Sequence, residues 1–137
     1  MKAENIKFRA KRTDTGAWVY GDLAHVQRIN TKEQAEQSGR RTEPSVRVAN
    51  YDVDEETIGQ YTGLKDKSGK EIYGWDILAH NGEPIGYIVD GVRGYCFDVI
   101  YFSPEYEESW SLYGVVVKDF NGDVEIIGNV YDEEQGG

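Results

Sequence analysis

The strongest constraint in the sequence is a succession of short apolar segments after residue 75, separated by tight-turn signals. The separators include Asn81-Gly82 and Asn121-Gly122, and both residues of an Asn-Gly pair tolerate the positive φ of a two-residue hairpin. Short strands joined in this way are typical of a small closed sheet, which hides most of its edges. The sequence therefore predicts a mainly β protein with a C-terminal, SH3-like small barrel. Its strands are predicted at 76–80, 84–90, 94–102, 110–119 and 123–131.

A smaller β-rich part is predicted to precede the barrel. At the start of the chain, apolar Ile6, Phe8 and Ala10 alternate with basic side chains, which is the two-residue period of a half-buried strand. The sequence "TDTG" then supplies a turn in which Gly16 is free to take a positive φ. Strand character resumes over "AWVYGDLAHV". These features predict a hairpin over residues 5–26.

A polar segment separates this hairpin from the next strand, "SVRVANYDV". Residues 30–44 hold almost no apolar side chain and cannot bury enough surface to offset the entropy of ordering. We predict an exposed, flexible loop there. Asp54 is expected to cap a helical turn over the three residues that follow it. The expected organisation is an N-terminal hairpin subdomain over residues 1–53 and a barrel domain with an acidic tail over residues 54–137.

The stretch "TGLKDKSGKEIYGWDI", residues 62–77, combines lysines, carboxylates, glycines and a tryptophan in the manner of a functional site. It lacks the glycines, the Gly-Lys-Ser/Thr ending and the following helix of a phosphate-binding loop. A turn between two strands explains it better, because carboxylates accept hydrogen bonds from turn amides and glycines adopt left-handed or bent backbone. We expect Gly74 to bend the chain before Trp75. The residues with predicted structural roles are Asp66, Gly69, Gly74 and Asp76.

Three stretches together resemble the YopX family of phage and prophage proteins. They are "IKFRAKRTDTGAWVYGDL" (6–23), "DEETIGQYTGLKDKSGKEIYGWDIL" (54–78) and "VEIIGNVYDE" (124–133), and they occur in the family's order. One departure is visible: the family usually has Glu-Gly-Asp after the Ile-Tyr pair, whereas this chain has Gly74-Trp75-Asp76. The aspartate keeps its register, and the glycine has moved one place earlier.

The resemblance implies a C-terminal SH3-like barrel, in agreement with the strand pattern, and a smaller β-rich part before it. It also implies a phage or prophage origin, and hence the cytoplasm of a bacterial host cell. It brings no established activity and no catalytic residues that can be mapped onto this chain.

Charge is distributed unevenly along the sequence. Residues 1–44 carry a net charge of +3 and residues 45–78 carry −3, while residues 79–137, with two Lys/Arg against twelve Asp/Glu, carry −10. A C-terminal portion this acidic repels phosphate backbones, which disfavours nucleic-acid binding. Nucleic-acid binding is kept only as a minor alternative, through the basic first strand. Its candidate residues are Lys7, Arg9, Lys11 and Arg12.

Catalytic and cofactor chemistry finds little support in the sequence. The single cysteine excludes an internal disulfide and a four-thiolate zinc site. His25 and His80 have no metal-ligand spacing, and no serine lies in a nucleophile-elbow sequence. We therefore expect no enzyme, no metal and no cofactor. No charged-then-apolar leader or apolar run of membrane length occurs, so the expected location is the cytoplasm.

The segment "SPEYEESWSLYG" (103–114) is the most promising candidate for function. It places aromatic rings among carboxylates in a predicted loop, and such a surface can hold a basic peptide through cation–π and Coulomb attraction. The first hypothesis is thus a phage-encoded, non-enzymatic accessory protein that binds a host or phage protein. A partner with a basic surface would match the acidic residues of this segment. The alternative is a self-assembling homo-oligomer. The candidate binding residues are Glu105, Tyr106, Glu107, Glu108, Trp110 and Tyr113.

Overall fold

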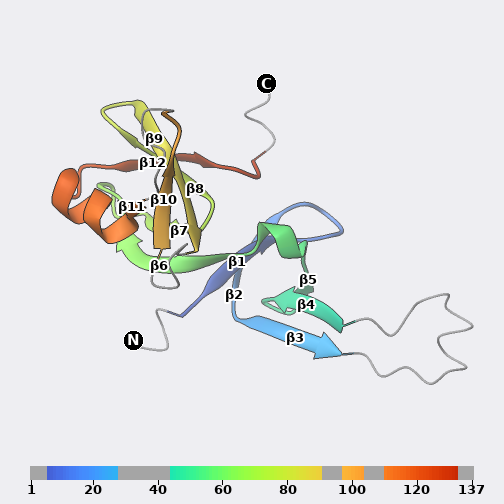
Figure 1. Ribbon diagram of the computed structural model, residues 1–137. Helices are drawn as coiled ribbons and strands as arrows, with labels where there is room; N and C mark the ends of the chain where they lie inside the picture. The colour runs from blue at the N-terminus through green and yellow to red at the C-terminus, as the bar shows by residue number, and fades with distance from the viewer. Residues whose placement is uncertain (1–5, 28–43, 91–96, 104–109, 133–137) are drawn as a thin grey trace, which may run out of the picture. The chain divides into compact units, whose positions relative to one another are not determined.

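The computed structural model describes residues 6–27, 44–90, 97–103 and 110–132 (Figure 1). The described part is mainly β, which confirms the predicted fold class. The chain divides into two compact units, Lys7–Ile58 and the described residues from Gly59 onward. Each unit has its own strands and its own hydrophobic core. The predicted loop over 30–44 lies outside the described residues, apart from Pro44.

The unit Lys7–Ile58 contains two antiparallel strand arrangements. The first is the predicted hairpin of β1 and β2, with Lys11 opposite Trp18 and Gly16 at a φ of 73° in the turn. In the second, β3 pairs with β4 and β4 pairs with β5. The elements are β1 (Phe8–Lys11), β2 (Trp18–Gly21), β3 (Leu23–Gln27), β4 (Pro44–Val48), β5 (Tyr51–Asp52) and the 3₁₀ turn η2 (Glu55–Thr57).

Two local features of this unit differ from the sequence pattern, and one agrees with it. The predicted second strand of the hairpin is two strands, because β2 pairs with β1 whereas β3 pairs with β4. A tight turn at Ala49 and Asn50, with φ values of 53° and 67°, separates β4 from β5. The predicted cap is present, since the Asp54 side chain accepts a hydrogen bond from the amide of Glu56 at 3.2 Å.

The second unit is built on a five-stranded antiparallel sheet of order β11-β10-β9-β8-β12. Among the described residues, no pairing joins the outer strands β11 and β12 into a closed barrel. Strands β6 and β7 pair antiparallel as a hairpin that is not part of this five-stranded sheet. The elements are β6 (Gly59–Lys65), β7 (Glu71–Tyr73), β8 (Asp76–His80), β9 (Glu83–Asp90), β10 (Phe97–Tyr101), β11 (Trp110–Ser111), the helix η3 (Gly114–Asp119) and β12 (Glu125–Asn129).

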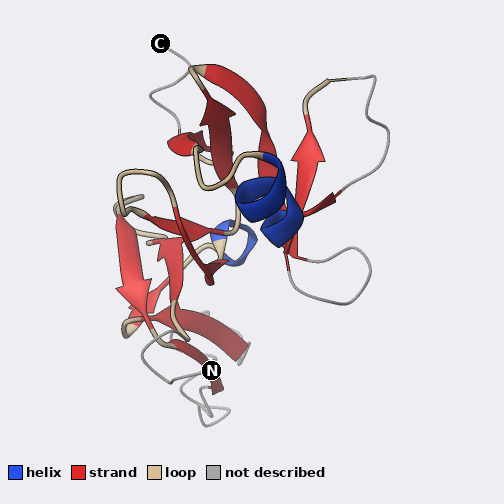
Figure 2. Ribbon diagram, turned by 90° about the vertical axis from the view of Figure 1, so that its left-hand side faces the viewer, coloured by secondary structure: helices blue, strands red, loops and turns tan. Residues whose placement is uncertain are grey.

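The core of the second unit lies between this sheet and η3. The helix lies against the sheet rather than extending it (Figure 2). Eight buried side chains form the core, and burying each aliphatic one contributes about 1.5–3 kcal/mol. They are Ile72, Leu78, Ile88, Val99, Leu112, Val115, Val116 and Val124.

The strand predicted at 110–119 is wrong beyond its first two residues, because the chain there forms η3. The buried positions 112, 115 and 116 recur at the three- and four-residue spacing of a helix, and positions 117–119 are exposed. This burial pattern prevails over the β preference of the Val-Val-Val run. η3 is a π-helix, in which the amide of Phe120 donates to the carbonyl oxygen of Val115 at 3.1 Å.

The Asn-Gly pairs both adopt positive φ, as predicted, but only one joins two strands. Asn81 and Gly82 connect β8 to β9 with φ values of 51° and 81°. Asn121 and Gly122 have the same values but follow η3, where the amide of Gly122 donates to Val116 at 2.7 Å. The second pair therefore ends a helix.

The Asp66 carboxylate organises the turn between β6 and β7, as the sequence predicts. One oxygen, Oδ1, accepts hydrogen bonds from the amides of Ser68 and Lys70, each at 2.9 Å. Gly69 completes the turn with a φ of 85°. The second oxygen, Oδ2, accepts from the amide of Ile126 in β12 at 3.2 Å. The turn is thereby attached to the last strand of the unit.

The second predicted turn, between β7 and β8, has its strain at an unexpected residue. Asp76 is 1% exposed and accepts a hydrogen bond from the amide of Tyr73 at 2.8 Å, as predicted. The positive φ falls on Trp75, at 74°, and not on Gly74. A left-handed conformation costs a residue with a side chain about 1–2 kcal/mol. The glycine is therefore displaced by one position from the place where this backbone requires it.

We predict that Trp75→Gly is more stable than Trp75→Ala, although alanine usually gives the more stable protein of the two residues. Both variants delete the indole ring, so their difference isolates the backbone. The left-handed strain of about 1–2 kcal/mol in the alanine variant exceeds the roughly 0.4–1 kcal/mol that alanine gains by restricting the unfolded chain. Urea denaturation of the two proteins measures the difference. A more stable alanine variant would show that position 75 is not strained.

Candidate functional site

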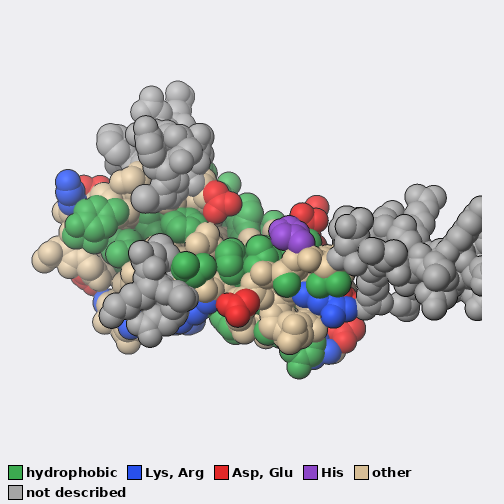
Figure 3. All heavy atoms as spheres, turned by 90° about the horizontal axis from the view of Figure 1, so that it is seen from below, with side chains coloured by type: hydrophobic (Ala, Val, Ile, Leu, Met, Phe, Trp, Pro, Cys, Tyr) green, Lys and Arg blue, Asp and Glu red, His purple; other side chains and the backbone are tan. Residues whose placement is uncertain are grey.

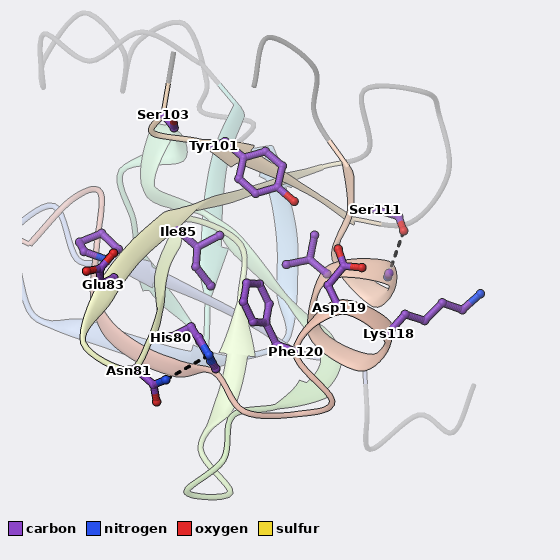
Figure 4. A pocket seen from close by; sticks show the side chains of 13 residues that line it. His80, Asn81, Glu83, Ile85, Tyr101, Ser103, Ser111, Lys118, Asp119 and Phe120 are labelled. Atoms are coloured by element: carbon purple, nitrogen blue, oxygen red, sulfur yellow. Dashed lines mark hydrogen bonds between the residues drawn. The ribbon is translucent and has the colours of Figure 1, made fainter. Parts of the chain in front are cut away.

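A cavity of about 950 Å³ lies beside η3 in the second unit (Figure 4). Its floor is apolar, and its edge carries hydroxyl, carboxylate, amide, imidazole and ammonium groups. This combination and volume are typical of ligand sites, in which apolar surface supplies affinity and a few polar groups supply orientation. The lining residues are His80, Asn81, Glu83, Pro84, Ile85, Tyr101, Ser103, Ser111, Gly114, Val115, Lys118, Asp119 and Phe120.

The floor of the cavity is held by the core. Val115 is fully buried, and Ile85, Tyr101 and Phe120 pack against the buried core cluster. The side chains of Ile85, Tyr101 and Phe120 converge on the centre of the cavity (Figure 4). Because their positions are fixed by packing, the apolar surface is preorganised and costs little conformational entropy on binding.

His80 is held at one end of the cavity in a defined tautomer. Its Nδ1 lies 2.7 Å from the carbonyl oxygen of Asp123, and a carbonyl can only accept, so Nδ1 carries the proton. Its Nε2 lies 3.2 Å from Nδ2 of Asn81, an amide donor, and therefore accepts. The ring also packs against Phe120, with centroids 4.6 Å apart. The hydrogen bonds thus fix the plane of the His80 ring beside Phe120.

We predict that the neutral tautomer of His80 carries its proton on Nδ1 and not on Nε2. The carbonyl of Asp123 fixes this tautomer, because the alternative would place two lone pairs against each other. Long-range ¹H–¹⁵N correlation spectra of the uniformly labelled chain distinguish protonated from bare ring nitrogens, and His25 provides an internal comparison. A spectrum that places the proton on Nε2 would contradict the assigned hydrogen bonds.

The edge of the cavity has a small excess of negative charge. Glu83 and Asp119 are exposed carboxylates, and Lys118 is the cation among the lining residues. The Asp119 side chain lies toward the cavity, whereas Lys118 extends away from it (Figure 4). A group entering the cavity thus meets carboxylates near an apolar floor. Such an edge attracts a cationic group more than an anionic one.

The predicted binding loop adjoins this cavity through its described ends. Residues Glu105, Tyr106, Glu107 and Glu108 lie outside the described residues. Ser103 and Ser111, on either side of them, line the cavity. Trp110 begins β11, and Tyr113 precedes η3 with 55% of its surface exposed. Hydrophobic side chains are exposed on the part of the surface around η3, at the left of the view in Figure 3.

The sequence pattern missed most of the cavity. Ile85 and Tyr101 were predicted only as strand residues, and Phe120 lay between two predicted strands. Their convergence depends on η3, which was predicted as a strand. His80 was examined for metal spacing alone. The Asn-Gly pair that follows His80 was the one available signal, since it places the ring beside a hairpin turn.

The basic first strand is engaged within its own unit. Arg9 is 6% exposed, and its guanidinium lies 4.9 Å from the centroid of the Trp18 ring. The ammonium of Lys11 lies 5.5 Å from the same ring. Arg12 lies over Tyr51 and donates two hydrogen bonds to Asp14, at 2.9 Å and 2.6 Å. Burial of Arg9 corrects the expectation that the strand presents an open basic face.

The pair of Arg12 and Asp14 is exposed and changes the pKa of both groups. The side-chain hydrogen bond, opposed by desolvation, lowers the pKa of Asp14 below its ordinary value and raises that of Arg12. We predict that Arg12→Gln returns the pKa of Asp14 toward its ordinary value, as measured by NMR titration of the carboxyl carbon. An unchanged Asp14 pKa would show that the pair does not form in solution.

Within the described ranges, no group of three or more His, Cys, Asp or Glu side chains is arranged to hold a metal ion. No helix among the same residues is long and apolar enough to span a membrane.

The fold and the cavity together define a mainly β protein of two units, with an apolar recess beside a π-helix in its acidic unit. The family model described as YopX protein matches residues 7–135. The chain therefore belongs to the YopX family, which confirms the resemblance seen in the sequence. A search of curated proteins finds no match.

Proposed function

We propose that this protein is a non-enzymatic accessory protein that binds another protein through the cavity beside η3. The observation that carries the proposal is the combination of a fixed apolar floor with the carboxylates of Glu83 and Asp119 at the edge. An apolar side chain of the partner would enter the recess, and a neighbouring Lys or Arg would meet the carboxylates. The phage or prophage origin implied by the family resemblance makes a host or phage protein the expected partner.

The position of the cavity also supports this function. Its edge includes Ser103 and Ser111, which flank the acidic and aromatic residues 104–109 of the sequence. The sequence of that segment adds three carboxylates, those of Glu105, Glu107 and Glu108. A partner bound at the cavity would therefore be a basic protein, attracted by charge and anchored by an apolar contact.

Affinity capture from nuclease-treated bacterial lysate tests the proposal, with the tagged full chain as bait and mass spectrometry as the readout. Wild type is expected to recover a basic protein in stoichiometric amount. The double variant Glu83→Lys/Asp119→Lys is expected to recover at least about ten-fold less, since charge reversal turns attraction into repulsion at the edge. The triple reversal of Glu105, Glu107 and Glu108 to Lys tests the adjoining segment in the same way.

The matched control is Glu55→Lys/Glu56→Lys, which changes the net charge equally but lies on the exposed turn η2 of the other unit. It should recover the partner as wild type does. Equal recovery by the cavity variant and wild type would contradict the proposal. Recovery of the bait alone as a defined multimer would instead favour the self-assembling alternative.

A further inference from the structure

Four aromatic rings of the second unit contact one another in series, and we call them the ring row. Tyr131 meets Trp75 edge-on, with centroids 5.5 Å apart and planes at 85°. Trp75 stacks on Tyr87 at 6.4 Å and 18°, and Tyr87 meets Phe102 at 6.0 Å and 35°. The four residues come from separate segments: the turn that follows β12, the β7–β8 turn, the middle of β9 and the residue after β10.

The ring row lies outside both hydrophobic cores. In β9, Gly86 and Ile88 are buried whereas Tyr87 between them is half-buried, as expected for a side chain on the other face of the sheet. Ile77 and Ile100, directly opposite Tyr87 on the two neighbouring strands, are also half-buried. Phe102 is 49% exposed. The rings therefore form an apolar surface that the core does not use.

The backbone fixes Trp75 in this row. Its amide donates to the carbonyl oxygen of Ile88 at 2.8 Å, and its carbonyl accepts from the amide of Val130 at 2.9 Å. Two strands thus hold a tryptophan in a left-handed conformation that favours glycine. Strained residues persist only where the surrounding structure fixes them, and they cluster at functional sites. A strained residue whose large ring lies in a partly exposed aromatic row points to binding.

We propose that the ring row binds an extended, proline-containing basic segment of a partner protein. A polyproline II helix has three residues per turn and advances about 9 Å per turn, so residues three apart share a face. The ring row, with successive centroids 5.5–6.4 Å apart, offers a series of rings on which successive turns of such a segment can rest. Proline rings and aliphatic stems pack well on aromatic faces, and the preformed helix loses little entropy when it binds.

The location of the row on the sheet favours polyproline II over an added β-strand. The middle of the row, Trp75 and Tyr87, lies at the start of β8 and on β9, and each of these strands is already hydrogen-bonded on both sides. A segment bound there consequently finds rings but no strand edge, and its backbone must remain hydrated. Polyproline II has no internal hydrogen bonds and a fully solvated backbone, so it loses none on binding there.

The charge of the unit selects a basic segment and excludes nucleic acid. Residues 59–137 contain five Lys/Arg and fifteen Asp/Glu, so they carry the whole net charge of −10. Asp132 directly follows Tyr131, and Asp90 is exposed at the end of β9. Base-stacking platforms for single-stranded nucleic acid combine rings with positive charge, whereas the net charge of this unit is strongly negative. The ring row shares no residue with the cavity, so the two proposals can fail separately.

Fluorescence anisotropy with the full chain and labelled twelve-residue peptides tests the proposal. The probe peptide is (Pro-Pro-Arg)₄, and the comparisons are (Gly-Ser-Arg)₄, (Pro-Pro-Glu)₄ and a twelve-residue oligothymidylate. We expect saturable binding of (Pro-Pro-Arg)₄ and at least about ten-fold weaker binding of each comparison. Trp75→Gly removes the ring and leaves the left-handed backbone unstrained, and Phe102→Ala removes a second ring. Each variant is expected to weaken binding about ten-fold, as for aromatic anchors.

Tyr20→Ala is the matched control, because Tyr20 is 54% exposed on the other unit, and it should bind as wild type. The thermal transition of each variant confirms folding. Unchanged binding by both Trp75→Gly and Phe102→Ala would overturn the proposal. Equal binding of (Gly-Ser-Arg)₄ would also overturn it, because that result would indicate charge attraction alone. Stronger binding of the oligothymidylate than of (Pro-Pro-Arg)₄, or no binding of (Pro-Pro-Arg)₄, would overturn it as well.

Discussion

The Asp66 carboxylate is the interaction on which the second unit most depends. It joins the turn after β6 to β12, which lies 60 residues further along the chain, while the neighbouring amide of Lys67 donates to Val124 at 2.8 Å. These contacts fix the far edge of the five-stranded sheet against the β6–β7 hairpin. Asp76, almost fully buried, acts locally and closes the β7–β8 turn by accepting a hydrogen bond from the amide of Tyr73. Carboxylates in this stretch accept backbone hydrogen bonds, and that use explains a sequence that reads as a reactive site.

The sequence could predict the strands, turns and caps because each follows from a few adjacent residues. Asp54, Asp66, Gly69 and Asn81-Gly82 act as predicted. The sequence could not predict η3, because the Val-Val-Val run favours a strand locally and becomes helical only when positions 112, 115 and 116 meet the core. Since the cavity depends on η3, it could not be predicted either. Trp75 was recognised as a departure from the family pattern, but only the backbone shows that it occupies the left-handed position.

The acidic unit combines two apolar surfaces with different characters. The cavity is a recess with a floor fixed by the core, and it suits an inserted side chain. The ring row is a line of exposed or half-buried rings, and it suits an extended segment. Both occur in the part of the chain that carries the whole net negative charge, whereas residues 7–58 contain nine Lys/Arg and nine Asp/Glu and are neutral. The occurrence of the charge and of both surfaces in one unit is the physical basis for our proposal that this unit is the binding part of the protein.

The most direct test of this account is the stability of Asp66→Asn beside the triple variant Lys67→Ala/Ser68→Ala/Lys70→Ala, measured by urea denaturation. Asparagine keeps one acceptor for the turn but presents an amide to the N–H of Ile126, so we predict a loss of about 1–3 kcal/mol. The triple variant removes only exposed side chains and should lose less than about 1 kcal/mol. A stable Asp66→Asn protein beside a normally folded triple variant that no longer captures its partner would contradict the account, because the stretch would then be a site and not a structural turn.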